Sequence, residues 1–154
     1  MFSTSFKRLM TIFISLTITA NVFANKKNAG NDFEDIFDAW TKAFNQKKYP
    51  EVCELFSKKI KADYQGVPRK NYSTICKGFQ KIFQETEMTY QNQFKIHEVY
   101  QSNNLAAVRI TWYLSVYKKG VHQYSIQEEG LDIFQKDDNN KWKIVNYIAY
   151  PVLN

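Results

Sequence analysis

The spacing of the apolar residues changes once along the chain, and this change most constrains the fold. Between residues 33 and 83 apolar side chains recur every three to four positions, as in amphipathic helices. After about residue 88 they alternate with polar side chains, as in strands with one buried face. Turn sequences at 103–104, 119–120 and 137–140 divide this second half into four strands. Helices followed by an antiparallel meander predict the α+β class.

Three helices are expected in the first half. The first follows a cap at Asn31 or Asp32, the second is short and opens at Pro50, and the third follows a cap at Asn71. Residues 61–68 contain Gly and Pro, which predicts a short extended piece and a turn before the third helix.

The N-terminal 24 residues have the three parts of a secretory signal peptide. Lys7 and Arg8 precede an apolar run over 9–20, and 22–24 (VFA) reads as a small-residue cleavage site. The run is shorter than the roughly 20 residues that a membrane span needs. We therefore expect a 1–24 signal peptide, a 25–31 flexible lead and a single domain over 32–154. The expected destination is the bacterial periplasm, without stable membrane insertion after cleavage.

Charge and histidine placement exclude two classes of partner. The net charge of +6 falls to +4 without the leader, because the leader holds two basic residues and no acidic one. The remaining lysine pairs are scattered, whereas nucleic-acid binding needs a clustered basic surface. His97 and His122 have no further ligands at metal-binding spacing, so we expect no metal and no other cofactor.

Two cysteines, Cys53 and Cys76, remain in the mature chain. An even number in an oxidising compartment favours a disulfide, and both fall on the core side of their expected helices. The alternative is a pair of buried thiols. In either case we expect the cysteines to be structural and not catalytic.

Three local sequences carry a family resemblance. They are Trp40 with Phe44 one helical turn later, ADYQGVP at 62–68, and GLDIF at 130–134 followed by an acidic turn and KWKI at 141–144. Together with the element order, they resemble the nuclear transport factor 2-like superfamily, also called cystatin-like or SnoaL-like, over 32–151. The resemblance implies three helices packed in the concave face of a strongly bent, four- to five-stranded, mainly antiparallel sheet. This cone has a ligand pocket at its mouth. The fold hosts enzymes, binders and scaffolds, so it does not decide function.

The ketosteroid isomerases of this superfamily use two carboxyl groups. Asp63 is similar to their general base, and Asp132 to the neutral acid that donates a hydrogen bond to the developing oxyanion. Where the family has an oxyanion tyrosine this chain has Trp40, which weighs against isomerase activity. The alternative is that Asp63 caps the following turn and Asp132 faces solvent.

Strand parity places Glu128 on the same face as Asp132. If that face is concave, both enter the cone. In such a fold aromatic residues serve as core or as pocket wall, and tyrosine hydroxyls can stand at the mouth. The expected pocket residues are Trp40, Phe56, Tyr64, Phe79, Tyr90, Trp112, Glu128 and Tyr150.

The outer face of the sheet is expected to carry an ion pair and an interface. Arg109 falls opposite Glu129 in the expected pairing. Aromatic and apolar side chains on the same face predict a homodimer. They are Tyr113, Tyr117, Val145 and Tyr147.

Three functions are compatible with these observations. The first is an exported, non-enzymatic domain that binds a small apolar or amphipathic molecule in the cone pocket. The second is an isomerase or cyclase that uses Asp63 as base and Asp132 as acid. The third is a dimeric assembly module whose pocket is filled by its own side chains. The first is slightly favoured, because the isomerase set of donors is incomplete.

Overall fold

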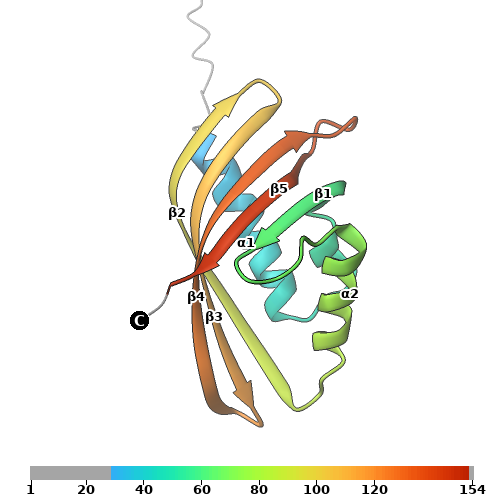
Figure 1. The fold of residues 1–154 in the computed structure, drawn as a ribbon, viewed down its shortest axis with the longest axis vertical. Coiled ribbons are helices and arrows are strands. Elements are labelled where there is room, and N and C mark those ends of the chain that lie inside the picture. Colours follow the sequence, from blue (N-terminus) through green and yellow to red (C-terminus); the bar gives the residue numbers. More distant parts are fainter. Residues whose placement is uncertain (1–28, 153–154) are drawn as a thin grey trace, which may run out of the picture.

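The computed structural model describes residues 29–152 and has two α-helices against one five-stranded sheet (Figure 1). The strand order is β1-β5-β4-β3-β2, with β1 parallel to β5 and the other neighbours antiparallel. The predicted α+β class and mainly antiparallel sheet are confirmed, whereas the predicted leader lies outside the described residues. The elements are α1 (Ala29–Asn45), the 3-10 helix η1 (Glu51–Cys53), β1 (Phe56–Tyr64), α2 (Tyr72–Phe83), β2 (Met88–Ser102), β3 (Leu105–Lys118), β4 (Val121–Lys136) and β5 (Trp142–Pro151).

The prediction of three helices is wrong. The expected second helix is reduced to the three residues of η1, and the chain is already a strand at Phe56. Ile60 and Ala62 are buried while Lys61 between them is exposed, which is the alternation of a strand and not of a helix. The strand expected at residue 61 therefore starts earlier. At the other end, α1 begins at Ala29, ahead of the expected cap.

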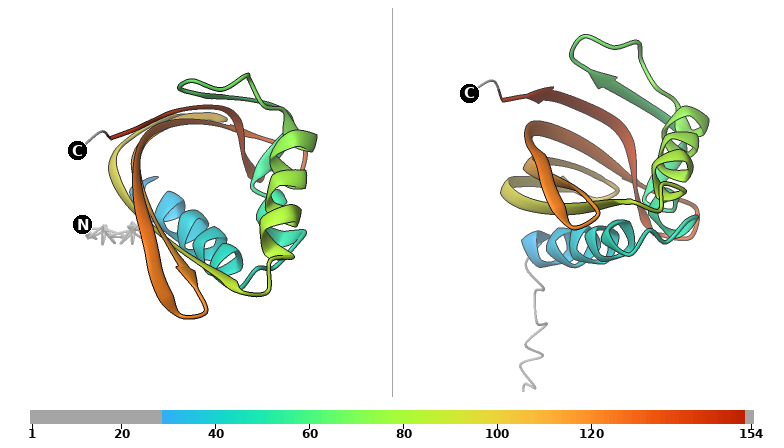
Figure 2. Two further views of the ribbon diagram at one scale, coloured as in Figure 1. Left: turned by 60° about the horizontal axis from the view of Figure 1, so that its bottom comes forward. Right: turned by 90° about the horizontal axis from the view of Figure 1, so that it is seen from below.

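The sheet is strongly bent around the helices (Figure 2). Three register breaks interrupt its antiparallel pairs, each leaving one residue without an opposite partner: His97 in β2, Gln123 in β4 and Val145 in β5. Such bulges increase the local twist and bend the strand. The bend gives a cone, with α1 on its concave face and α2 beside β1 (Figure 2).

An aromatic cluster holds α1 on the sheet. Phe33 and Phe37 are fully buried, and their rings lie 4.9 and 5.6 Å from that of Phe134 in β4. At the C-terminal end of α1, the Asn45 amide donates to the Asn92 carbonyl at 3.0 Å and its oxygen accepts from the Asn92 N–H at 2.6 Å. The helix is thus fixed at both ends of its contact with the sheet.

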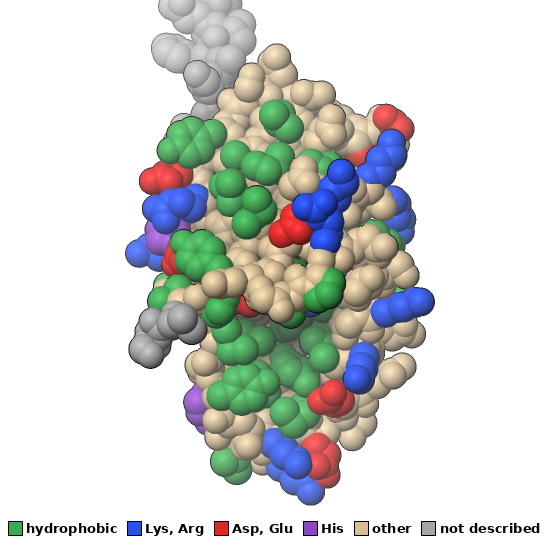
Figure 3. Space-filling view, viewed as in Figure 1, with side chains coloured by type: hydrophobic (Ala, Val, Ile, Leu, Met, Phe, Trp, Pro, Cys, Tyr) green, Lys and Arg blue, Asp and Glu red, His purple; other side chains and the backbone are tan. Residues whose placement is uncertain are grey.

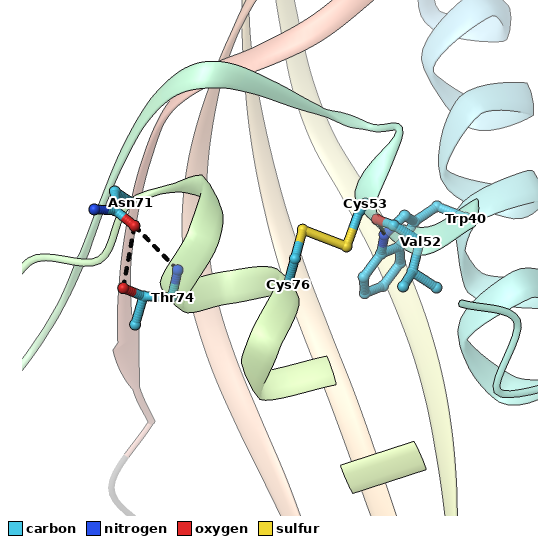
Figure 4. Close-up of a disulfide and its surroundings, with 6 residues drawn as sticks. All are labelled: Trp40, Val52, Cys53, Asn71, Thr74 and Cys76. Atoms are coloured by element: carbon cyan, nitrogen blue, oxygen red, sulfur yellow. Dashed lines mark hydrogen bonds between the residues drawn. A yellow bond between two sulfur atoms is a disulfide. The ribbon is translucent and has the colours of Figure 1, made fainter. Parts of the chain in front are cut away.

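A disulfide between Cys53 and Cys76 joins η1 to α2, as predicted (Figure 4). Asn71 caps α2, accepting from the Thr74 N–H at 3.0 Å, also as predicted. On the other side of η1, the Trp40 indole N–H donates to the Val52 carbonyl at 2.9 Å. The disulfide and this hydrogen bond link η1 to both helices. Over 29–152, no helix is both long and apolar enough to span a membrane.

Removing the disulfide should destabilise the fold. The cysteines are 23 residues apart, and closing a loop of that size is worth about 3 kcal/mol in the chain-entropy description. The double variant Cys53→Ala/Cys76→Ala should lose about that much free energy of unfolding in urea titrations. Asn71→Ala, which removes only the cap of α2, serves as the matched comparison and should lose about 1 kcal/mol. Equal losses in the two variants would contradict the disulfide's assigned role.

Candidate functional site

A cavity of about 220 Å³ lies between the concave face of the sheet and the two helices. Figure 3 shows apolar side chains around a hollow in the lower half of that view, between the β3–β4 hairpin and α2. Most of the wall is aromatic or aliphatic, and it includes six of the residues expected there. These are Trp40, Phe56, Tyr64, Phe79, Trp112 and Glu128.

Asp132 is the deepest polar group of the wall. It is 0% exposed, and neither carboxyl oxygen has a hydrogen-bond partner among the described residues. Its inward position follows from strand parity, which also turns Glu128, Gly130 and Phe134 toward the cone. Burial raises the pKa of Asp132 well above its ordinary value, because the charged form has lost its water. The structure therefore favours the protonated carboxyl.

Tyr147 lies directly opposite Asp132 in the register of β4 and β5 and is buried in the cavity wall. Its ring crosses Gly130. A Cβ atom on Gly130 would lie 3.2 Å from Cε2 of the ring and 3.6 Å from its hydroxyl oxygen. Gly130 stands between Glu128 and Asp132 on the inner face of β4, so the ring lies over the part of the strand that separates the two acids. A side chain at Gly130 would displace the ring.

The prediction that Tyr147 faces outward is wrong, and the bulge at Val145 is the reason. The extra residue reverses the alternation of β5, so the face that holds Ile144 holds Tyr147 and Ala149 beyond the bulge. Tyr150, expected in the pocket, is consequently 54% exposed on the outer face.

Tyr64 and Glu128 line the cavity and also a neighbouring surface pocket, which Lys70 lines as well. The Tyr64 and Tyr147 rings meet edge to face at 5.1 Å, and the Lys70 ammonium lies 4.5 Å from the Tyr64 ring centre. Burial raises the pKa of Glu128, and the charge of Lys70 partly opposes this rise. Burial also raises the pKa of Tyr64, assisted by the charges of Glu128 and Asp132.

Asp63 and Asp132 are not brought together. Asp63 lies on the opposite side of β1 from Ala62 and Tyr64, and its carboxylate accepts a hydrogen bond from Arg69 Nε at 2.7 Å. It is not part of the cavity wall. A base at Asp63 acting on a ligand in this cavity does not match the geometry.

The Trp40 ring lines the cavity, but its N–H is bonded to the Val52 carbonyl. It therefore does not take the place of an oxyanion donor. Tyr90, also expected in the wall, is buried outside it and donates its hydroxyl proton to Glu85 at 2.8 Å.

Asn92 is a wall residue that sequence reasoning missed. Its backbone is tied to Asn45, while its side-chain oxygen is buried without a partner. The alternation of β2 contained a usable signal, because Tyr90, Asn92 and Phe94 share one face. For Tyr147 there was no comparable signal, because nothing in the sequence marks the bulge.

The outer face of the sheet holds a self-contained polar network. Arg109 Nε donates to Glu98 at 2.7 Å, and Arg109 Nη1 lies 3.8 Å from Glu129, the predicted partner. The Thr111 hydroxyl donates to Glu129 at 2.7 Å and lies 2.6 Å from His97 Nε2. These groups satisfy one another, so the network is structural. Within residues 29–152, no three His, Cys, Asp or Glu side chains gather as metal ligands.

No protein-family model and no curated protein matches the sequence. Solved structures match the fold. A ketosteroid isomerase-like protein from Erwinia carotovora atroseptica has a TM-score of 0.63 at 20% identity, covering 79% of this chain and 94% of that one. An NTF-2 like protein of unknown function from Shewanella oneidensis has a TM-score of 0.68 at 16% identity, covering 79% and 98%. A cystatin-like domain from Nostoc punctiforme has a TM-score of 0.65 at 15% identity, covering 81% and 78%. The chain therefore has the NTF2-like, cystatin-like fold implied by its sequence.

Replacing Asp132 should stabilise the protein, increasingly so with rising pH. The unfolded carboxyl ionises above about pH 4, whereas burial holds the pKa of the folded one well above its ordinary value. Asp132→Asn removes this difference, so its advantage in unfolding free energy should grow by up to about 1.4 kcal/mol per pH unit until Asp132 ionises in the fold. Urea unfolding from pH 4 to 7 measures this.

The matched control is Asp63→Asn, which alters an exposed carboxylate and should give no such growth. A constant difference between Asp132→Asn and the parent across this pH range would show that Asp132 is not buried as described.

Proposed function

We propose that this chain is an exported binding protein that holds a small apolar or amphipathic molecule in the cone cavity. The observation that carries the proposal is a largely apolar cavity in which Asp132 presents two oxygens without partners. Buried polar groups are normally hydrogen-bonded, so a bound molecule with a matching polar group supplies what the fold leaves out. Apolar walls with few polar groups are the usual composition of a small-molecule site.

The size of the cavity limits the ligand. A volume of 220 Å³ equals about seven waters at roughly 30 Å³ each, below the usual range for drug-sized ligands. This favours a molecule with one ring or a short chain. The unfilled volume also favours binding over an assembly module whose pocket is closed by its own side chains.

An isomerase or cyclase is the alternative, and the geometry supports it less. Asp63 is bonded to Arg69 away from the cavity, so Glu128 is the second carboxyl group in the wall. Glu128 and Asp132 are four residues apart on one strand, which separates their Cα atoms by about 13 Å. The likeness to a ketosteroid isomerase-like structure is a likeness of fold, and the paired carboxyl groups of that chemistry do not follow from it.

The Cys53–Cys76 disulfide fits an extracellular or periplasmic protein. Together with the leader sequence at 1–24, it supports export to the bacterial periplasm as part of the proposal. The ligand would then be a molecule that occurs in that compartment.

Ligand binding should be visible at two of the three tryptophans. Trp40 and Trp112 line the cavity, whereas Trp142 does not. Titration with 2-phenylethanol should shift the indole N–H signals of the first two saturably in NMR spectra. Trp142 is the internal control. We expect a dissociation constant of about 1 mM or lower, which needs only about 0.5 kcal/mol per non-hydrogen atom.

Two substitutions on β4 locate the binding site. Ile126 is 37% exposed at the cavity wall, and Leu131 is 38% exposed on the outer face. Ile126→Phe should raise the dissociation constant at least about fivefold, because it reduces the cavity, whereas Leu131→Phe should leave it unchanged. Equal affinity in the two variants would place the binding elsewhere.

We also propose that two copies associate through the outer face of the sheet. Tyr147 is buried and does not belong to this face. Ile148 and Tyr150, which are 53% and 54% exposed, lie on it together with the predicted Tyr113. Apolar side chains gather on the upper half of the face in Figure 3. A contiguous apolar surface of this kind is typical of an interface.

The mass in solution tests this association. Light scattering should give twice the chain mass, and Ile148→Lys should shift the protein to a monomer, because a buried, unpaired ammonium is costly. Gln80→Lys, at an exposed position of α2, is the control. A parent protein of single-chain mass would exclude the association.

A further inference from the structure

We propose that the ligand of the cavity carries a protonated amine that lies against Asp132, so that the cavity selects organic cations over neutral and anionic molecules of the same shape. The inference rests on the proposed function, because it concerns the same cavity and names the chemical class of its ligand.

The first observation is a shortage of hydrogen-bond donors. Among the described residues, four buried side-chain atoms have no hydrogen-bond partner, and three of them lie in this wall: both carboxyl oxygens of Asp132 and Oδ1 of Asn92. All three are acceptors when Asp132 is ionised. Asn92 in β2 pairs with Leu114 in β3, which pairs in turn with Ile126 in β4. Ile126 is six residues before Asp132 on β4, so Asn92 is at the other end of the cavity from Asp132. The unpaired acceptors deep in the cone are therefore those of Asp132.

The second observation is the aromatic surround of this carboxyl group. Tyr147 lies opposite it in the sheet, and the Tyr64 ring packs edge to face on that of Tyr147. Aromatic faces attract cations, and tyrosine oxygens accept hydrogen bonds. The chain's own Lys70 already lies 4.5 Å from the Tyr64 ring centre, in the neighbouring surface pocket. A ligand ammonium would approach the same cluster from inside the cavity.

The third observation is the sign of charge on the wall. Its ionisable residues are Asp132, Glu128 and the two tyrosines, and no Lys, Arg or His of the described chain lines it. A ligand carboxylate beside Asp132 would meet an acid that no cation of the wall compensates. A hydroxyl group can donate one hydrogen bond, whereas an ammonium donates three and can satisfy both oxygens of Asp132 and a tyrosine oxygen. The wall therefore complements an amine better than an alcohol or an acid.

Binding of an amine should release a proton from Asp132, whereas binding of a neutral ligand should not. Asp132 is faced by Tyr147 on β5, by Tyr64 on β1 and by Glu128 on its own strand, with Lys70 beyond Glu128. In the empty cavity burial raises the pKa of Asp132 and so favours its protonated form. When an ammonium binds, that proton leaves to solvent and the carboxylate pairs with the cation. One proton is released per ligand, so affinity should rise up to tenfold per pH unit until Asp132 ionises in the empty protein.

Three probes of similar shape test the inference: 2-phenylethylamine, 2-phenylethanol and 3-phenylpropanoate. With the parent protein at pH 7, the amine should bind at least about tenfold more tightly than the alcohol, and the acid should not saturate the Trp40 and Trp112 signals. Calorimetry in two buffers of different ionisation enthalpy should show about one proton released for the amine and none for the alcohol.

Asp132→Asn keeps the size of the side chain and removes its charge. It should bring the amine and the alcohol to within about twofold of each other and abolish proton release. Asp63→Asn, which alters a carboxylate outside the cavity, should change neither quantity.

The outcomes separate the two proposals. If the alcohol binds in the cavity but the amine binds no more tightly, or releases no proton from the parent protein, the amine assignment is wrong and the binding function stands. A preference for the amine that survives in Asp132→Asn also overturns the assignment. If none of the three probes saturates the cavity signals, both proposals fail. The proton-release measurement uses the parent protein, so it decides the matter even if Asp132→Asn does not fold.

Discussion

The cavity depends on one extra residue in β5. At Val145 the strand gains a residue that β4 does not match, and every side chain beyond it changes face. Tyr147 thereby enters the cone, and its ring crosses Gly130 between the two acids of β4. Without the bulge, Ile148 and Tyr150 would face the interior and the ring opposite Asp132 would be absent. The chemistry of the wall is thus set by backbone register as much as by residue type.

Asp132 is a buried polar residue without hydrogen-bond partners among the described residues, in an otherwise apolar core. Phe33, Phe37 and Phe134 pack around the base of the cone, and a buried carboxyl group without partners weakens the same region. Sites of this kind persist where a bound molecule completes the hydrogen bonds or where the group has a chemical task.

The charged side chains on the two faces of the sheet differ in whether they have partners. On the outer face Arg109 forms ion pairs with both Glu98 and Glu129, and Thr111 and His97 extend the network by hydrogen bonds. On the inner face Asp132 has no such partner. The charged groups of the outer-face network thus have hydrogen-bond or ion-pair partners, whereas the buried carboxyl group of the inner face has none within the described part of the chain. An incomplete set of partners inside a cavity is the feature that points to a ligand, whereas a complete one points to structure.

The class of fold, the disulfide, the cap at Asn71 and seven of the fifteen residues of the cavity wall could be predicted from the amino-acid sequence. Each of these follows from local spacing: a period near 3.6 or 2, an even pair of cysteines, or a polar residue ahead of a helix. Glu128 and Asp132 were placed together by the same rule, because β4 keeps its alternation between them. Asp63 was assigned from the family resemblance and lies outside the cavity wall, whereas its neighbour Tyr64 lines the wall as predicted.

The pairing of residues across neighbouring strands, and the contacts between segments far apart in sequence, follow only from the folded structure. The bulge at Val145, the parallel pairing of β1 with β5 and the hydrogen bond of Trp40 to Val52 are contacts between segments far apart in sequence or shifts of register between strands. The alternation of apolar and polar residues along one strand does not predict how that strand is aligned with its neighbour. The identity of the acids in the wall could therefore be predicted from the chain, whereas the lack of a hydrogen-bond partner for Asp132 among the described residues is visible only in the folded structure.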